Sequence, residues 1–300
     1  MIAALILGLV AVALAANTIL VNRETRKAAP RDGGKIVDTP VVTANVKIEG
    51  DGPPLLLIHG FSAALDWWDE IAPALAKTHK VIRLDLIGHG GTEAPHAGYT
   101  IEDQAKLAGA VLDKLEIDSL PVIGHSMGGE VAGELAETRP GLVSRLVLID
   151  SPANLSVSFN PATEAYLTPV LGQLLYHLVT GRVVKRGLTQ GFAPGFPVPE
   201  KFVADAEQLT YTAFTHAHDK SVLYQKEKPA YERLKTLDPS IPILVIFGQE
   251  DRLVPVETAK LFEQVPNTTV KYVEGAGHSP MVEKPEATLE LIKAFLGEQP

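Results

Sequence analysis

A serine lies between closely spaced glycines in residues 124–129 (GHSMGG). The apolar run 120–123 before it predicts a strand, and residues 128–138 after it predict a helix. A sharp turn from strand to helix has no room for Cβ atoms, so it requires glycines and holds the serine hydroxyl clear of the backbone. The start of the helix favours negative charge that develops there. We therefore predict that Ser126 is a nucleophile, with a structural serine in a tight turn as the alternative.

A serine hydroxyl needs a base, and the base needs an orienting carboxylate. His278 follows the predicted strand 270–273, and Asp251 directly follows the predicted strand 243–247. The carboxyl ends of parallel strands meet at one edge of the sheet, where such sheets place their sites. We predict His278 as the base and Asp251 as its orienting acid. Asp150, at the end of another predicted strand, is the rival acid, because that end opens onto the same edge.

Backbone N–H groups are the usual donors to an oxyanion. Met127 directly follows the nucleophile, and Phe61 follows the apolar run 55–58. We predict the amides of Phe61 and Met127 as the two donors. Residues 85–90 (DLIGHG) close the next strand and are expected to shape the same edge. Their glycine spacing fits neither nucleotide fingerprint and no lysine follows them, so we reject a phosphate loop.

Short apolar runs alternate with helical patterns along most of the chain. The runs are residues 41–48, 55–59, 81–86, 120–124, 146–149, 243–247 and 270–273, and the helical patterns lie near 67–76, 101–115, 128–138, 256–264 and 285–296. This alternation predicts an α/β fold with a mostly parallel, doubly wound sheet and helices on both faces. The net charge of −9 argues against a nucleic-acid partner, and the absence of cysteine excludes disulfides and thiolate metal sites.

The chain divides into segments of different character. Residues 36–152 and 240–300 carry the alternating pattern, whereas residues 153–239 contain no convincing core strand and predict a helical cap, or lid. Within the cap, Thr168 and Pro169 predict the start of a helix whose apolar stripe ends at Gly181. The stripe predicts either ordinary packing against the core or the lining of an apolar substrate channel.

The N-terminal segment differs from the rest in charge. Residues 1–22 carry no charged side chain, and a helix of this length reaches about 30 Å, enough to cross a membrane. Residues 23–35 form a basic juxtamembrane linker with five cations, which are Arg23, Arg26, Lys27, Arg31 and Lys35. We predict an uncleaved single-pass membrane anchor. A cleaved signal peptide, giving a secreted or periplasmic protein, is the alternative, and the side of the membrane stays open.

The order Ser126, Asp251, His278 and five short motifs resemble the α/β-hydrolase superfamily. The motifs are H-G-F, D-x-x-G-x-G, G-H-S-M-G-G, G-x-x-D-x-x-x-P and G-x-G-H, and the resemblance covers about residues 40–297. It implies serine-mediated hydrolysis without a cofactor, and a helical cap inserted after the sixth strand. Members with an aspartate nucleophile, such as epoxide hydrolases, differ at the turn that carries the nucleophile, so Ser126 argues against their activities. The N-terminal span also resembles membrane-bound bacterial lysophospholipases and phospholipases A, which implies the inner membrane.

These features together predict an enzyme that hydrolyses carboxylic esters with apolar acyl groups. The expected partners are a small-molecule or lipid ester and the membrane, and the expected activity is that of an esterase, lipase or phospholipase. A C–C bond hydrolase, a thioesterase or a perhydrolase is the alternative on the same three residues. An alternative of another class is a ligand sensor that retains residual hydrolase activity.

Overall fold

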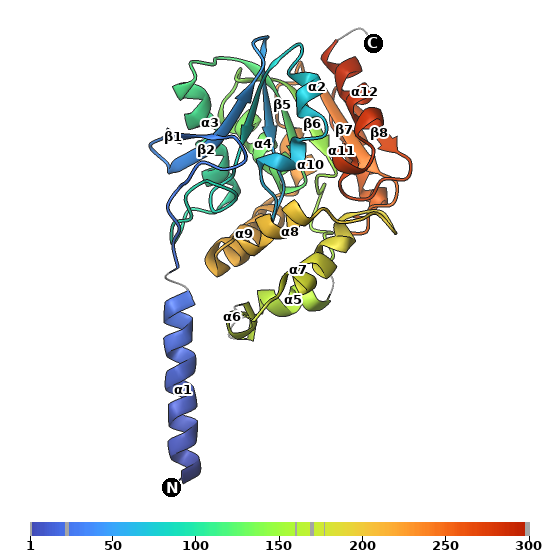
Figure 1. Ribbon diagram of the computed structural model, residues 1–300. Coiled ribbons are helices and arrows are strands. Elements are labelled where there is room, and N and C mark those ends of the chain that lie inside the picture. Colours follow the sequence, from blue (N-terminus) through green and yellow to red (C-terminus); the bar gives the residue numbers. More distant parts are fainter. Residues whose placement is uncertain (1, 22–23, 160, 169–170, 177, 298–300) are drawn as a thin grey trace.

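An eight-stranded sheet organises the chain, in the order β1-β2-β4-β3-β5-β6-β7-β8 (Figure 1). β1 and β2, and β2 and β4, pair antiparallel, and every other neighbouring pair is parallel. The computed structural model describes residues 2–21, 24–159, 161–168, 171–176 and 178–297. The predicted mostly parallel α/β fold is confirmed. The strands are β1 (Lys35–Asp38), β2 (Thr43–Glu49), β3 (Pro54–Ile58), β4 (Lys80–Leu84), β5 (Leu120–His125), β6 (Val143–Ile149), β7 (Ile243–Gly248) and β8 (Thr268–Val273).

Helices cover both faces of this sheet, which explains why its central strands are continuously apolar. In β3, Leu56 and Ile58 join one buried cluster, while Leu55 and Leu57 join another on the opposite face. The first cluster includes side chains of α3 (Ile101–Lys114) and α4 (Met127–Thr138). The second includes side chains of η1 (Leu65–Trp68), α2 (Ala72–Leu75), α11 (Pro280–Glu283) and α12 (Pro285–Leu296).

Two predicted helices have a different geometry in the structure, and one strand was not predicted. The helix expected over 67–76 is a 3₁₀ turn, η1, followed by the short α2. The helix expected over 256–264 is η3 (Val256–Gln264), which has 3₁₀ geometry. The strand β1 begins at Lys35, within the predicted linker, and was not predicted. β1 has four residues, and its outer two are exposed, so it shows no apolar run.

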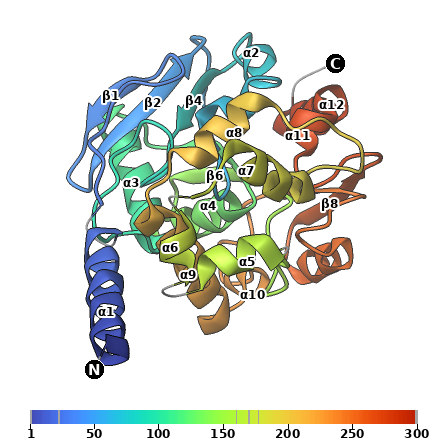
Figure 2. The same cartoon turned by 60° about the horizontal axis from the view of Figure 1, so that its bottom comes forward.

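Between β6 and β7 the described residues form helices joined by loops, and no strand. The helices are α5 (Pro161–Leu167), α6 (Leu171–Tyr176), α7 (Gly181–Leu188), η2 (Thr189–Gly191), α8 (Glu200–Glu207), α9 (Tyr211–Glu227) and α10 (Ala230–Leu234). Figure 2 shows α5 to α8 in front of the sheet. The single helix predicted to end at Gly181 is wrong. The extended backbone of Thr180 separates α6 from α7, and Gly181 begins α7. Pro169, its predicted first residue, lies outside the described residues.

Glu130 ties α4 to the cap, a contact that the sequence did not predict. Its carboxylate accepts hydrogen bonds from Oγ of Ser221 (2.7 Å) and Nε2 of Gln225 (2.7 Å), both in α9. Only 2% of the Glu130 surface is exposed. Burial raises the pKa of Glu130 to about 7, although the two hydrogen bonds oppose this. Glu130 therefore gains or loses its charge near pH 7, at a contact between the core and the cap.

The N-terminal helix α1 (Ile2–Val21) extends from the molecule on the same side as α5 and α6 (Figure 1). Its 18-residue window Ile2–Ile19 has a mean hydropathy of 2.4, and none of that window is buried. By length and composition the helix could cross a membrane. A signal sequence near the N-terminus would have the same properties. Near its end, Oγ1 of Thr18 donates a hydrogen bond of 2.7 Å to Oε1 of Gln173 in α6. The helix therefore contacts the cap.

Two cations of the predicted linker turn inward. The backbone of Arg26 pairs with that of Ala94, and its guanidinium donates to the carbonyl oxygen of Gly88 (3.3 Å). The guanidinium of Arg31 pairs with Asp205 of α8 (3.4 Å). These two side chains fasten the linker to the core and the cap. Arg23, which was also predicted to belong to the basic linker, lies outside the described residues.

We predict that Glu130→Gln makes the protein less sensitive to rising pH. The native state raises the pKa of Glu130 from 4.5 to about 7, so it binds the proton more tightly than the unfolded state does. Stability is therefore lost as the pH rises through this range, by at most about 3 kcal/mol. Glutamine is neutral throughout, so the melting temperature of the variant relative to wild type should increase from pH 5 to pH 8.

Thermal denaturation of the detergent-solubilised chain measures this difference. Glu290→Gln, on an exposed position of α12, is the matched control and should show a smaller change. A Glu130→Gln curve that runs parallel to wild type at both pH values would contradict the prediction.

Candidate active site

Ser126 joins β5 to α4 in a backbone conformation that L-residues rarely adopt, with φ 52° and ψ −122°. The turn is in close contact with its neighbours. A Cβ atom at Gly124 would lie 2.3 Å from the carbonyl oxygen of Gly128, and one at Gly128 would lie 2.4 Å from the oxygens of Ile58 and His59. These contacts supply the physical reason for the glycines around Ser126, as the motif predicted. The Ser126 side chain lines a cavity.

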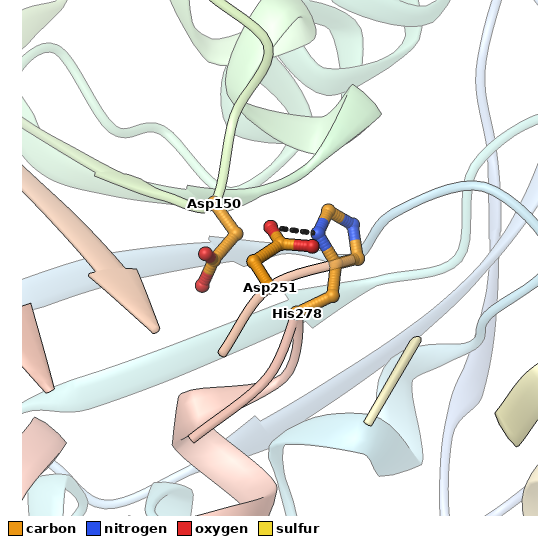
Figure 3. Close-up of side chains that lie close together, drawn as sticks. All are labelled: Asp150, Asp251 and His278. Atoms are coloured by element: carbon orange, nitrogen blue, oxygen red, sulfur yellow. Dashed lines mark hydrogen bonds and ion pairs between the residues drawn. The ribbon is translucent and has the colours of Figure 1, made fainter. Parts of the chain in front are cut away.

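His278 and Asp251 lie side by side after β8 and β7 (Figure 3). Nδ1 of His278 donates a hydrogen bond of 2.7 Å to Oδ2 of Asp251. The other oxygen, Oδ1, accepts the backbone N–H groups of Leu253 (2.7 Å) and Val254 (3.1 Å). Burial opposes ionisation of Asp251, but the charge of His278 and these hydrogen bonds outweigh it and lower its pKa. With its Nδ1 proton held by a carboxylate, His278 can accept a proton at Nε2.

Two of the three predicted residues line one cavity, and the third contacts one of them. Ser126 and His278 both line it, and Asp251 lies behind His278. No direct hydrogen bond joins Ser126 to His278, two residues that the structure describes. Such contacts are often long without substrate and tighten when it binds. The roles of nucleophile, base and orienting acid remain predictions.

His125 supports the loop that carries His278. Its Nε2–H donates to the carbonyl oxygen of His278 (2.7 Å), and the two ring centroids are 5.0 Å apart. Burial, with the charge of His278, lowers the pKa of His125 to about 3, so this ring is neutral. Trp67 stacks on His125, and Phe202 of α8 stacks on Trp67 with centroids 4.0 Å apart. The sequence motif around Ser126 did not predict these contacts of His125, because His278, Trp67 and Phe202 lie far from it in the sequence.

Asp150, the predicted rival acid, lies beside Asp251 and has no direct hydrogen bond with the described ring of His278 (Figure 3). Its Oδ1 accepts the backbone N–H of Gly248 at 3.0 Å. Burial, followed by the charge of Asp251, raises the pKa of Asp150 well above its usual range. In this geometry Asp251 forms a hydrogen bond with His278 and Asp150 does not.

The loop after β3 passes directly beside the candidate nucleophile. A Cβ atom at Gly60 would lie 3.0 Å from Cβ of Ser126. Among the described residues, no acceptor receives a hydrogen bond from the backbone N–H of Phe61 or of Met127. Both amides are thus available to a ligand, and their role as oxyanion donors stays a prediction.

Asp85, in the segment predicted to shape this edge, supports the same loop. Its carboxylate accepts hydrogen bonds from the backbone N–H groups of Leu65 (2.7 Å) and Gly91 (2.8 Å) and from Nδ2 of Asn45 (2.7 Å). Burial raises the pKa of Asp85 to about 6. A Cβ atom at Gly90 would lie 2.1 Å from this carboxylate, so the glycine permits the contact. In segment 85–90, the carboxylate of Asp85 therefore holds the neighbouring loops in place through hydrogen bonds.

The cavity beside Ser126 has a volume of about 320 Å³ and is bounded by the core and the cap. Its walls are mostly apolar, and Glu207 of α8 is a charged side chain among them. Such a cavity suits a ligand with one reactive polar group and an apolar remainder. The apolar walls include Phe61, Val157, Phe159, Val184, Leu188 and Phe214.

Two groups of side chains lie close enough to share a cation by distance alone. They are Asp150, Asp251 and His278, and Asp32, Asp66 and Asp205. In each group one carboxylate already has a partner. His278 donates a hydrogen bond to Asp251, and the guanidinium of Arg31 pairs with Asp205. We therefore assign neither group a metal ion.

Comparison with known proteins places this geometry in a family. The chain matches the family described as the alpha/beta hydrolase fold over residues 53–285. An uncharacterized protein of Mycobacterium tuberculosis is 28% identical over 262 residues, which cover 83% of this chain and 77% of that protein. Monoacylglycerol lipase ABHD6 of Homo sapiens is 28% identical over 260 residues, which cover 82% of this chain and 76% of the lipase.

A solved structure extends the similarity to almost the whole chain. The crystal structure of a membrane phospholipase A, described as a bacterial virulence factor, superposes with a TM-score of 0.73 and 26% identity. The alignment covers 99% of this chain and 94% of the phospholipase. The family match spans the segments that carry Ser126, Asp251 and His278, and the sheet has the expected parallel order. This chain belongs to the alpha/beta hydrolase fold family.

Proposed function

We propose that this protein is a serine hydrolase that cleaves carboxylic esters with apolar acyl groups. The observation that carries this proposal is that Ser126, in a strained turn, and His278, hydrogen-bonded to Asp251, line the same apolar cavity. Strained backbone conformations are concentrated at functional sites. An ionised acceptor on Nδ1 leaves Nε2 of His278 as the basic atom for a hydroxyl.

The reaction proceeds through an acyl-enzyme. Oγ of Ser126 attacks the ester carbonyl while Nε2 of His278 takes the hydroxyl proton. The amides of Phe61 and Met127 stabilise the oxyanion. His278 then returns the proton to the leaving alcohol, and the C–O bond of the ester breaks. Water, activated by the same base, attacks the acyl-enzyme and releases the carboxylic acid. Asp251 keeps the imidazole in the required tautomer throughout.

The apolar wall of the cavity favours an acyl chain over a polar substrate. Each buried CH₂ group contributes about 0.8 kcal/mol to binding an apolar chain. The related proteins named as a monoacylglycerol lipase and a membrane phospholipase A suggest the same substrate class. We therefore favour esters of glycerol or glycerophospholipids over small soluble esters.

The proposed organisation places the cavity near a membrane. Residues 1–22 form the anchor, residues 23–35 the linker, residues 36–152 and 240–300 the hydrolase core, and residues 153–239 the cap. Thr18 of α1 contacts Gln173 of α6, so the cap lies on the side of the molecule from which the anchor extends (Figure 1). An enzyme held in this way draws an apolar substrate from the lipid phase. The weaker resemblance to bacterial membrane phospholipases favours the inner membrane.

Ser126→Ala should abolish covalent labelling by a fluorophosphonate and lower ester hydrolysis to background, because the attacking oxygen is removed. Gel fluorescence of the labelled protein and hydrolysis of esters of rising acyl length measure the two effects. Ser144→Ala, at an exposed serine of β6, is the matched control. Labelling of the folded Ser126→Ala protein at the wild-type rate would identify a different nucleophile.

Asp251→Asn should lower kcat by about 10⁴-fold, because an amide next to Nδ1 favours the wrong imidazole tautomer. KM for the ester should change much less, since Asp251 does not line the cavity. Steady-state kinetics measure both constants, and Glu250→Gln, at the exposed neighbouring position, is the control. If Asp150→Asn caused this loss while Asp251→Asn resembled wild type, the two acids would exchange roles.

Residues 1–22 should remain attached and hold the protein in the membrane. Intact-mass measurement of protein extracted from membranes should give the full chain, and carbonate washing should not release it. Leu9→Asp should weaken retention, since a carboxylate near the centre of a span costs about 3 kcal/mol, while Leu9→Ala should preserve it. A chain shortened by about 15 residues that salt removes from membranes would indicate a cleaved signal peptide.

A further inference from the structure

Asp150 has one carboxylate oxygen whose hydrogen bonding is unexplained. Its side chain is fully buried at the end of β6, and Oδ1 accepts the backbone N–H of Gly248. Oδ2 is buried, and no N–H or O–H group of the described chain donates to it. One carboxylate oxygen from each of Asp150 and Asp251 and a ring nitrogen of His278 all lie within 4.8 Å of one another (Figure 3). A buried oxygen without a donor is costly unless it carries a proton itself.

The surroundings of the two carboxylates differ in a way that decides which one is charged. Asp251 accepts hydrogen bonds from His278 and from two backbone N–H groups, which lower its pKa. Asp150 accepts one, from Gly248, and faces the charges of Asp251 and of Glu283 in α11. Burial and these charges raise the pKa of Asp150 well above its usual range. Two adjacent buried carboxylates share one charge, as a like charge disfavours the second ionisation.

We propose that Asp150 is a protonated positioning residue, which donates the hydrogen of its Oδ2 to the carboxylate of Asp251 and holds that carboxylate against His278. This role rests on the proposed function, in which His278 is the base. Asp150 lies behind Asp251 and does not line the cavity, so it acts through Asp251 and not on the ester. The left-handed backbone at Asp150, with φ 45°, accompanies this placement at the strand end.

Asp150 can hold Asp251 in place only when it is neutral. An ionised Asp150 would repel Asp251 and supply no hydrogen, so Asp251 would be free to turn from Nδ1 of His278. A protonated Asp150 gives Asp251 a fourth hydrogen-bond donor while leaving the group with one negative charge. The charges that bear on Asp150 are those of Asp251, His278 and Glu283, from the loops after β7 and β8 and from α11.

Two substitutions of similar size test whether Asp150 acts as a hydrogen-bond donor or only fills space. Asp150→Leu removes the donor, and kcat should fall about ten- to a hundred-fold because a hydrogen bond to a charged group is lost. Asp150→Asn restores a neutral N–H donor and an oxygen for Gly248, so it should recover most of kcat. KM should change little in either chain. Equal losses of kcat in both variants, with melting temperatures near wild type, would overturn the proposal.

The pH profile of kcat/KM tests the charge of Asp150 separately. Its acid limb reports protonation of the base. If Asp150 is neutral, Asp150→Asn removes no charge and the acid limb stays in place. If Asp150 is ionised, the substitution removes a negative charge beside His278, and the limb should move by about half a pH unit or more to lower pH. A shift of that kind would overturn the proposal.

Infrared spectroscopy gives a readout that does not depend on activity. The wild-type minus Asp150→Asn difference spectrum at pH 7, recorded on the full chain in detergent, should contain the C=O stretch of a protonated carboxyl group. A carboxylate band in its place would overturn the proposal. If Ser126→Ala retained full activity, the proposed function would fail, and the same difference spectrum would still report the protonation of Asp150.

Discussion

The left-handed turn at Ser126 is held by close backbone contact among three segments of the sheet. A left-handed residue that is not glycine costs about 1 kcal/mol or more, and the surrounding contacts must offset that cost. The backbone N–H of Ser126 donates to Ile149 of β6 at 2.8 Å, and Oγ of Ser151 donates to the carbonyl of Ser126 at 3.0 Å. Gly128 brings α4 onto the end of β3. The turn thus fixes the relative positions of β3, β5 and β6, whose ends form the site.

Several ionisable groups near the site and at the contacts with the cap are buried, so their surroundings decide whether they are charged. Asp251 keeps its charge through hydrogen bonds, whereas burial raises the pKa of Glu130 to about 7 and that of Asp205 to about 9. His125 is neutral beside His278. Glu130 and Asp205 lie where the core or the linker meets the cap. Buried acids therefore make two kinds of contact: Asp251 accepts a hydrogen bond from a histidine, and Glu130 and Asp205 connect the cap to the core and the linker.

The cap is attached to the rest of the chain by contacts of different kinds. Glu130 binds α9 through hydrogen bonds, Trp67 stacks on Phe202 of α8, and Arg31 pairs with Asp205. Thr18 adds a contact between the N-terminal helix and α6. The cavity is enclosed between these attachments, so its shape depends on segments that are distant in sequence. The N-terminal helix therefore contacts the cap, which forms part of the cavity wall.

The sequence alone determined the features that depend on short segments. Apolar runs gave the parallel strands, and the glycines around Ser126 gave the turn, because a strand, a sharp turn and a helix start are local requirements. Asp251 and His278 were located because the carboxyl ends of parallel strands meet at one edge. The local patterns did not reveal the edge strand β1, the division of the lid helix at Thr180, or the inward turn of Arg26 and Arg31. They favoured Asp251 over Asp150 as the acid next to His278, and the contact between the two side chains is seen in the structure. Only the tertiary structure decided these features, since each depends on partners far away in the chain whose distance and burial no local pattern encodes.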